Sequence, residues 1–249
     1  MYDVIIIGAG PGGIFSAYEL MKQDENLKIA VFDAGHSLEQ RHCPIDGEKV
    51  KSCISCKTCA IMNGFGGAGA FSDGKYNITN DFGGTLYEYI GRQKALELMK
   101  YVDTINMSHG GEGTKMYSTA GTDLKKVCLQ NKLKLLDMNV KHLGTDKNYL
   151  TMQNLIRALA DDGVEMLAFY DCERVEKHDG GYTLYYTNGE KIEAEKIIIA
   201  TGRGGANFVA DFCRSFGVKM RSNYVDIGVR VEMKDIIWRE FSDLRFERK

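Results

Sequence analysis

The chain has 249 residues, with 32 Lys or Arg against 34 Asp or Glu, which gives a formal net charge of −2. Hydrophobic residues make up 44% and charged residues 27%, an ordinary globular composition that excludes bulk disorder and a fibre. The balanced charge provides no overall attraction to nucleic acid or to an anionic membrane. We therefore expect a globular protein with a small-molecule substrate and no nucleic-acid partner.

Neither a membrane anchor nor a secretion signal is expected from the sequence. No apolar run approaches the ~20 residues that a membrane-spanning helix needs. The amino-terminal run Tyr2–Ile7 is too short for a signal peptide and has no basic residues before it. We expect a cytoplasmic protein, in which the seven cysteines stay reduced and form no disulfide framework.

A strand, a helix and a second strand are predicted within the first 33 residues. Residues 2–7 form a short β-branched apolar run, as a buried parallel strand does. Residues 12–23 carry apolar side chains at helical spacing, and residues 28–32 form a second apolar run. This order predicts a parallel βαβ unit and an α/β fold of Rossmann type.

The turn between the first strand and the helix has the pattern G-x-G-x-x-G. Gly8 permits the tight turn, Gly10 lets a diphosphate approach the backbone, and Gly13 lets the helix pack on the sheet. The helix begins near Pro11, which has no N–H to leave unpaired, and its amino terminus offers N–H groups to phosphates. Asp33 ends the second strand, where a carboxylate accepts hydrogen bonds from ribose hydroxyls. We interpret this segment as a dinucleotide site.

The rest of the chain alternates between predicted helices and strands. Helices are predicted over residues 84–107, 122–134 and 150–161. Strands are predicted over residues 135–143, 164–175, 182–186, 191–194, 197–200 and 225–232. Asn188-Gly189, between two of these strands, is the signature of a β-hairpin.

Four cysteines lie close together in the sequence, at Cys43, Cys53, Cys56 and Cys59. A Cys-x2-Cys-x2-Cys segment with a further cysteine before proline is a spacing that iron–sulfur clusters use. Four thiolates equally suit tetrahedral zinc. A redox dithiol that exchanges electrons with a cofactor and free cysteines in a loop are the other interpretations, and the sequence leaves all four open.

The first glycine turn is one of several segments that match a known pattern. The others are Arg41–Pro44, Cys53–Cys59, Gly64–Lys75, His142–Asp146, Ala200–Gly202 and Asp226–Arg230. Gly64–Lys75 is the most specific of them. With a hairpin, a buried strand and Ala-Thr-Gly in that order, the chain resembles the FAD-dependent dehydrogenases, also called NAD(FAD)-utilising dehydrogenases, among the glutathione-reductase-like flavoproteins.

This resemblance implies a flavin-dependent oxidoreductase that binds FAD, with NAD(P)H as a candidate electron donor. Beyond the first glycine motif, the expected cofactor-binding residues are Ala34, Arg41, Gly66, Gly67, Gly69, Val175, Thr201 and Gly202. Ser72 and Lys75 are candidate catalytic residues, since a lysine beside the flavin would stabilise negative charge on its reduced form. The resemblance does not extend to a substrate.

The expected FAD-binding domain is discontinuous, with a parallel sheet and a β-hairpin or meander. It comprises residues 1–80 and 145–205, and residues 81–144 and 206–249 form an inserted substrate-side region. Family members are usually longer, so we expect a chain truncated at its carboxyl end, with an incomplete substrate-side region or a partner chain that completes the FAD site.

Three other functions fit the same sequence features. A flavin- or metal-containing electron-relay subunit would bind its cofactor but need a redox partner for turnover. An NAD(P)-dependent dehydrogenase would use the same fold and the same glycine motif. A flavoprotein acting on RNA is a third alternative, which the net charge of −2 disfavours.

Overall fold

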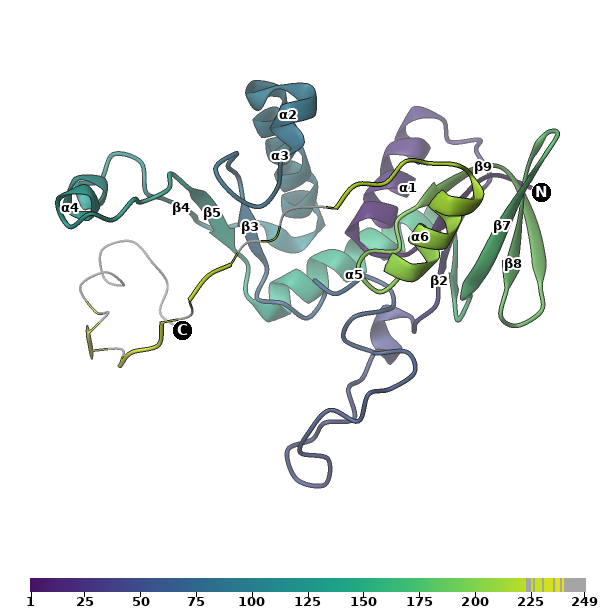
Figure 1. The fold of residues 1–249 in the computed structure, drawn as a ribbon, viewed down its shortest axis with the longest axis horizontal. Helices are drawn as coiled ribbons and strands as arrows, with labels where there is room; N and C mark the ends of the chain where they lie inside the picture. The colour runs from purple at the N-terminus through teal and green to yellow at the C-terminus, as the bar shows by residue number, and fades with distance from the viewer. Residues whose placement is uncertain (223–224, 226, 230, 235, 238, 240–249) are drawn as a thin grey trace. The chain divides into compact units, whose positions relative to one another are not determined.

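The computed structural model describes residues 1–222, 225, 227–229, 231–234, 236–237 and 239 (Figure 1). The chain forms two compact units. The first unit comprises Met1–Ser72 and Asn148–Met220, and the second comprises Asp73–Lys147 and Arg221–Lys249.

The first unit is built on a six-stranded sheet with the strand order β6-β2-β1-β9-β8-β7. Its strands are β1 (Tyr2–Ile7), β2 (Ile29–Asp33), β6 (Glu165–Ala168), β7 (Cys172–His178), β8 (Gly181–Tyr186) and β9 (Lys191–Ile199). β6, β2, β1 and β9 run parallel, whereas β7, β8 and β9 form an antiparallel meander. The predicted α/β fold of Rossmann type, with a meander beside the parallel sheet, is confirmed.

Helix α1 (Pro11–Gln23) connects β1 to β2 and packs directly on the sheet. Its side chains Ile14 and Ala17 are fully buried. The close packing depends on Gly13, because a Cβ there would overlap the Gly8 carbonyl oxygen and lie 3.2 Å from Cγ2 of Ile6. The last glycine of the motif therefore serves the fold, as the sequence predicts.

Helix α6 (Ala206–Ser215) packs through aromatic side chains on a hydrophobic core that includes Phe32 and Leu184. Phe208 and Phe212 of this helix contact the core, as does Phe216 directly after it. Helix α5 (Thr145–Asp161) buries Met152, Leu155 and Leu159, and a short 3₁₀ helix, η1 (Leu38–Gln40), buries Leu38. Helices α1, α5 and α6 thus pack around the sheet and hold the carboxyl ends of β1, β2 and β9 in place.

Two strand predictions in this unit are wrong in detail. The single strand predicted over 164–175 is two strands, β6 and β7, which lie at opposite edges of the sheet. They are separated by a turn in which Phe169 has a positive φ of 65° and its N–H donates to the Gly35 carbonyl oxygen. Conversely, the segments predicted as 191–194 and 197–200 form one strand, β9, which pairs with β8 in its first half and with β1 along most of its length.

The second unit contains a three-stranded antiparallel sheet with the order β3-β5-β4. Its elements are β3 (Lys75–Asn77), α2 (Leu86–Ile90), α3 (Arg92–Asn106), a π-helical turn η2 (Met107–Gly111), β4 (Met116–Ser118), α4 (Leu124–Gln130) and β5 (Asn139–His142). A largely buried ion pair of 2.5 Å joins Lys141 of β5 to Asp103 of α3. The single helix predicted over 84–107 is two helices, α2 and α3, with a break at Gly91.

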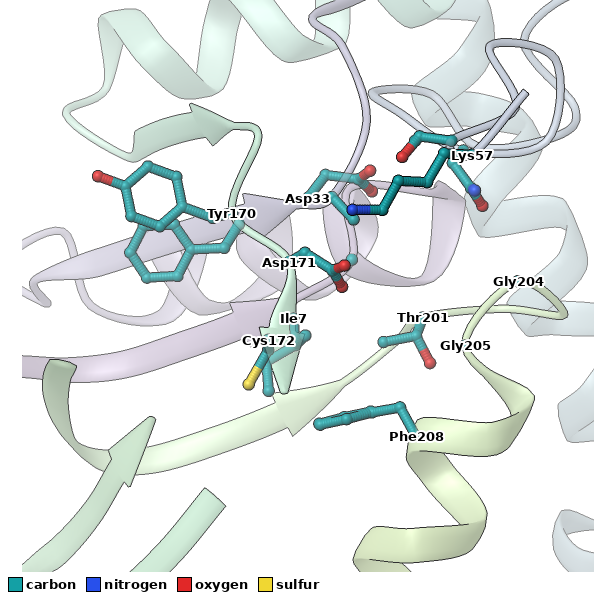
Figure 2. A pocket seen from close by; sticks show the side chains of 15 residues that line it. Ile7, Asp33, Lys57, Tyr170, Asp171, Cys172, Thr201, Gly204, Gly205 and Phe208 are labelled. Atoms are coloured by element: carbon teal, nitrogen blue, oxygen red, sulfur yellow. The ribbon is translucent and has the colours of Figure 1, made fainter. Parts of the chain in front are cut away.

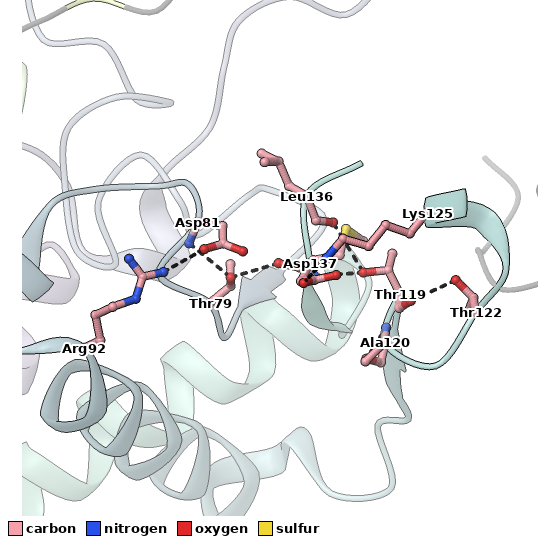
Figure 3. A network of polar contacts seen from close by, with 11 residues as sticks. Thr79, Asp81, Arg92, Thr119, Ala120, Thr122, Lys125, Leu136 and Asp137 are labelled. Carbon is pink, nitrogen blue, oxygen red and sulfur yellow. Dashed lines mark hydrogen bonds and ion pairs between the residues drawn. The ribbon is translucent and has the colours of Figure 1, made fainter. Parts of the chain in front are cut away.

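A network of polar contacts ties together the loops beside this small sheet (Figure 3). Arg92 pairs with Asp81 at 2.8 Å, and Lys125 pairs with Asp137 at 2.7 Å. Thr79 links the two pairs, because its hydroxyl accepts from the Asp81 N–H and donates to the Asp137 carbonyl oxygen. Side-chain contacts thus order loops that carry little regular structure.

The predicted strand over 225–232 includes Asp226 and Arg230, which lie outside the described residues, and the described residues of that segment are not in a strand. The assignment of 1–80 and 145–205 to FAD binding, and of 81–144 and 206–249 to the substrate side, stays a prediction. Within the part of the chain that the structure describes, no helix has the length and apolar character needed to cross a bilayer.

Gly13→Ala tests the contact between α1 and β1. Because the new methyl group would overlap backbone, we expect the free energy of unfolding to fall by about 3 kcal/mol, as measured by urea denaturation. Gly12→Ala is the matched control, since its Cβ would lie 3.6 Å from Cβ of Ala200, an ordinary contact. A Gly13→Ala protein as stable as the Gly12→Ala protein would contradict this account of the packing.

Candidate functional site

A cavity of about 460 Å³ lies at the carboxyl end of β1, where α1 begins. We call it the turn cavity, and its lining includes Gly10, Gly12, Gly67, Gly69, Thr201 and Gly202. Helix α1 has no side-chain cap at Gly10, and the first N–H groups of any helix have no acceptor within it. The cavity therefore opens onto backbone N–H groups and the positive end of a helix dipole.

The two glycine segments of the sequence meet at this cavity. Gly67 has a φ of +63°, and a Cβ at this position would lie 2.9 Å from Cα of Gly10 and 3.0 Å from Cδ of Pro11. The neighbouring Gly66 donates its N–H to the Ala9 carbonyl oxygen at 2.8 Å. Since the backbones touch without intervening side chains, the space beside them stays open to a ligand.

Asp33 links the end of β2 to the glycine turn. Its Oδ2 accepts from the Ala9 N–H and its Oδ1 from the Gly35 N–H, each at 2.8 Å. A carboxylate oxygen has two lone-pair sites, so these bonds leave acceptor capacity on a side chain that lines the turn cavity. The expected binding of a ribose by Asp33 stays a prediction.

A second cavity, of about 210 Å³, lies beside the ends of β1 and β2 (Figure 2). We call it the strand-end cavity. It shares Asp33, Asn63, Thr201 and Gly204 with the turn cavity. The two cavities are therefore neighbours along the carboxyl ends of the parallel strands, where open α/β sheets bind their ligands.

Charged side chains give the strand-end cavity a distinct electrostatic character. The pKa of Asp171 is raised, mainly because burial disfavours its charged form and also because Glu173 and Asp33 are negative, while Lys57 acts in the opposite direction. Burial also raises the pKa of the Cys172 thiol to about 12. At neutral pH that thiol stays protonated and is no nucleophile.

Thr201 carries a hydroxyl without a partner. Its Oγ1 is buried and makes no hydrogen bond among the described residues, although the side chain lines both cavities. Buried hydroxyls are nearly always paired in folded proteins. Thr201 is therefore a candidate to bind a polar ligand, because its side chain lines both cavities.

Arg41 is buried beside the second glycine segment, and its expected role near the cofactor stays a prediction. The side chain is 5% exposed and lines neither cavity. Its donors bind carbonyl oxygens of Ala60 at 2.8 Å and of Ile61, Phe65 and Gly67 at 2.7 Å. Burial lowers the pKa of this guanidinium. Arg41 therefore holds the second glycine segment in shape.

The other predicted cofactor residues fall into two groups. Gly8 and Ala34 line the strand-end cavity, and Pro11 lines the turn cavity. Gly66 and Val175 line neither, and Val175 is buried in the core between the strands. The cofactor role of each remains a prediction.

Several lining residues were not anticipated. They are Lys57, Asn63, Tyr170, Asp171, Arg203 and Phe208. Tyr170 and Asp171 follow the end of β6, and the ends of parallel strands share one edge of a sheet. Both residues could have been predicted from their position after a parallel strand. They were missed because residues 164–175 were predicted as one continuous strand.

The cysteine cluster is not assembled into a metal site. In the described part of the chain, which contains all four cysteines, no group of three or more His, Cys, Asp or Glu side chains is arranged to hold a metal ion. Cys53 and Cys56 are exposed, Cys43 and Cys59 are half-buried, and all four are free thiols. The irregular loop spreads side chains that are adjacent in the sequence, so the iron–sulfur and zinc interpretations are not supported.

Ser72 and Lys75, the candidate catalytic residues, belong to different units. Ser72 is exposed, and its N–H donates to the Gly69 carbonyl oxygen. Nζ of Lys75 lies 3.9 Å from the Asp73 carboxylate, and its side chain is 52% exposed. A catalytic role for either remains a prediction.

Comparisons with known proteins give structural likenesses only. No family model and no curated protein matches the chain. Among solved structures, the chain is similar to glycine oxidase from Geobacillus kaustophilus, with 17% identity and a TM-score of 0.48 over 84% of this chain and 57% of that one. It is also similar to NikD, an unusual amino acid oxidase essential for nikkomycin biosynthesis, with 12% identity and a TM-score of 0.47 over 87% of this chain and 54% of that one.

A flavoprotein/dehydrogenase from Cytophaga hutchinsonii shows 15% identity and a TM-score of 0.44 over 90% of this chain and 44% of that one. The chain thus spans about half the length of these three structures, between 44% and 57%. Because every one of these TM-scores lies below 0.5, the assignment of the fold comes from the strand order and the glycine turn of this chain.

Arg41→Lys tests whether the guanidinium organises the second glycine segment. Lysine keeps the positive charge but cannot donate hydrogen bonds to the four carbonyl oxygens that the planar guanidinium reaches. Leaving buried carbonyl groups unpaired is expected to lower the free energy of unfolding by about 3 kcal/mol and to make residues 59–71 sensitive to proteases. Arg157→Lys, at an exposed ion pair with Glu39, should leave both properties unchanged. Equal behaviour of the two variants would refute the proposed role.

Proposed function

We propose that the chain binds FAD and acts as a FAD-dependent oxidoreductase. The observation that carries the proposal is the turn cavity, where two glycine segments meet at the uncapped amino terminus of α1. A dinucleotide has a diphosphate that needs such a turn and sugar hydroxyls that need an acceptor such as Asp33. The unpaired hydroxyl of Thr201, which lines both cavities, supports the same ligand class.

The residues present fit the parts of this cofactor. Gly10 and Gly12 would face the diphosphate, Asp33 the ribose, and the strand-end cavity the adenine side. Arg203, which lines the turn cavity, supplies a positive charge for the phosphates. FAD, when bound, supplies the hydride chemistry, and the protein binds, orients and shields it.

FAD is favoured over NAD(P) by the second glycine segment. Gly64–Lys75 is the part of the chain with the most specific resemblance to FAD-dependent dehydrogenases, and its Gly67 contacts Gly10 of the first motif. An NAD(P)-dependent dehydrogenase is the second candidate, because the first motif serves both cofactors. A partner-dependent flavin relay subunit, which would bind FAD but need a redox partner for turnover, is the third.

Titration of the purified chain with FAD, NAD and NADP tests the choice between these cofactors. We expect a saturable one-to-one complex with FAD, seen as a perturbed visible absorption band and quenched flavin fluorescence. Binding of NAD or NADP with no binding of FAD would contradict the proposal and favour the second candidate.

Thr201→Val separates ligand binding from folding. The substitution keeps the shape but removes an unpaired buried hydroxyl, so the free energy of unfolding without FAD should stay the same or rise. If Oγ1 bonds to the dinucleotide, the dissociation constant for FAD should rise by about tenfold. Thr183→Val on β8, which lines neither cavity, should not change FAD affinity. Unchanged affinity in the Thr201→Val protein would show that this hydroxyl does not contact the ligand.

A further inference from the structure

Three charged side chains from separate segments surround the strand-end cavity (Figure 2). Asp33 lies at the end of β2, Asp171 lies in the turn between β6 and β7, and Lys57 lies in the loop that contains the cysteines. Figure 2 shows the Lys57 side chain extending into the cavity towards its acidic side. The charged side chains of this lining therefore carry one more negative than positive charge when all three are ionised.

These charges do not neutralise one another by direct contact. No ion pair joins Lys57 to either carboxylate among the described residues. Asp33 is instead bonded to the N–H groups of Ala9 and Gly35. All three side chains nevertheless line the same small cavity. The pKa of Asp171 responds to both neighbours, because Lys57 favours and Asp33 disfavours its negative charge.

We propose that Asp171 and Lys57 determine which nucleotides the strand-end cavity accepts, and that together with Asp33 they select a ribose with free hydroxyl groups over one that carries a 2′-phosphate. This inference rests on the proposed dinucleotide site and extends it to residues outside the glycine motif. Asp171 places a second negative charge beside the ribose acid, where it repels an added phosphate. Lys57 partly offsets this repulsion.

The two residues should therefore act in opposite directions on selectivity. Removing the charge of Asp171 weakens the repulsion of a 2′-phosphate, so discrimination against the phosphorylated nucleotide should fall. Removing the charge of Lys57 leaves both carboxylates without a compensating cation, so discrimination should increase. A purely structural role for either side chain predicts no such opposition, because a damaged pocket weakens the binding of both nucleotides together.

Isothermal titration calorimetry with ADP-ribose and 2′-phospho-ADP-ribose at low ionic strength tests this inference. The measured quantity is the ratio of the two dissociation constants. We expect Asp171→Asn to reduce the preference for ADP-ribose about tenfold and Lys57→Met to increase it about tenfold, the size of a charge contact at a partly exposed site.

Matched controls carry the same charge changes outside the cavity. Glu193→Gln removes a negative charge from an exposed position on β9, and Lys51→Met removes a positive charge from the loop that carries Lys57. Neither residue lines the strand-end cavity. Both controls should change the ratio less than threefold, the margin we set between a local contact and a long-range charge effect. Asp171→Ser repeats the first test with a smaller neutral side chain.

The outcomes distinguish this inference from the proposed function. If the unmodified chain binds neither ADP-ribose nor FAD, the dinucleotide site itself fails, and this inference fails with it. If the chain binds ADP-ribose but Asp171→Asn and Lys57→Met shift the ratio in the same direction, or no more than their controls do, the inference is overturned and the dinucleotide site stands. Opposite shifts of the expected sign support it.

Discussion

The site depends on one constraint, the direct contact of two glycine backbones at the end of β1. Gly67 touches Gly10 and Pro11, while Gly13 brings α1 against the Gly8 carbonyl group. Any side chain at Gly13 or Gly67 would force these segments apart. Because the contacts use no side chains, the uncapped start of α1 faces a cavity rather than packed protein. The packing that stabilises the fold is thus the same feature that keeps the ligand site open.

Some charged side chains near this contact hold the backbone in place, and others line the two cavities. The buried Arg41 uses its guanidinium on backbone carbonyl groups and fixes the second glycine segment. Asp33 fixes the first through Ala9 and still borders both cavities. Arg203 borders the turn cavity, and Lys57 borders the strand-end cavity. Asp33 and the second glycine segment are therefore held in place by hydrogen bonds to the backbone before any ligand binds.

Sequence patterns predicted the parts of the molecule that depend on neighbouring residues. The first βαβ unit, its glycine turn and Asp33 follow from local periodicity and spacing, and all are found in the structure. The division of 164–175 was missed because the turn uses Phe169 at positive φ, with no glycine or proline to indicate it. The hydrogen bonds of Arg41 could not be predicted, because its partners are carbonyl groups about 20 or more residues away, which no spacing rule connects. The cysteine prediction relied on sequence proximity alone, which an irregular loop does not convert into a shared site.

The most direct test of the central claim is the affinity of a Gly10→Val protein for FAD, measured by fluorescence titration beside Gln23→Val at the other end of the same helix. A valine at Gly10 would fill the space at the start of α1, so the account predicts at least a hundredfold loss of affinity, as expected when a side chain occupies the phosphate position. Gln23→Val should bind FAD like the unmodified chain. Equal affinity of the two variants, with both folded, would contradict the claim that a diphosphate rests at this turn.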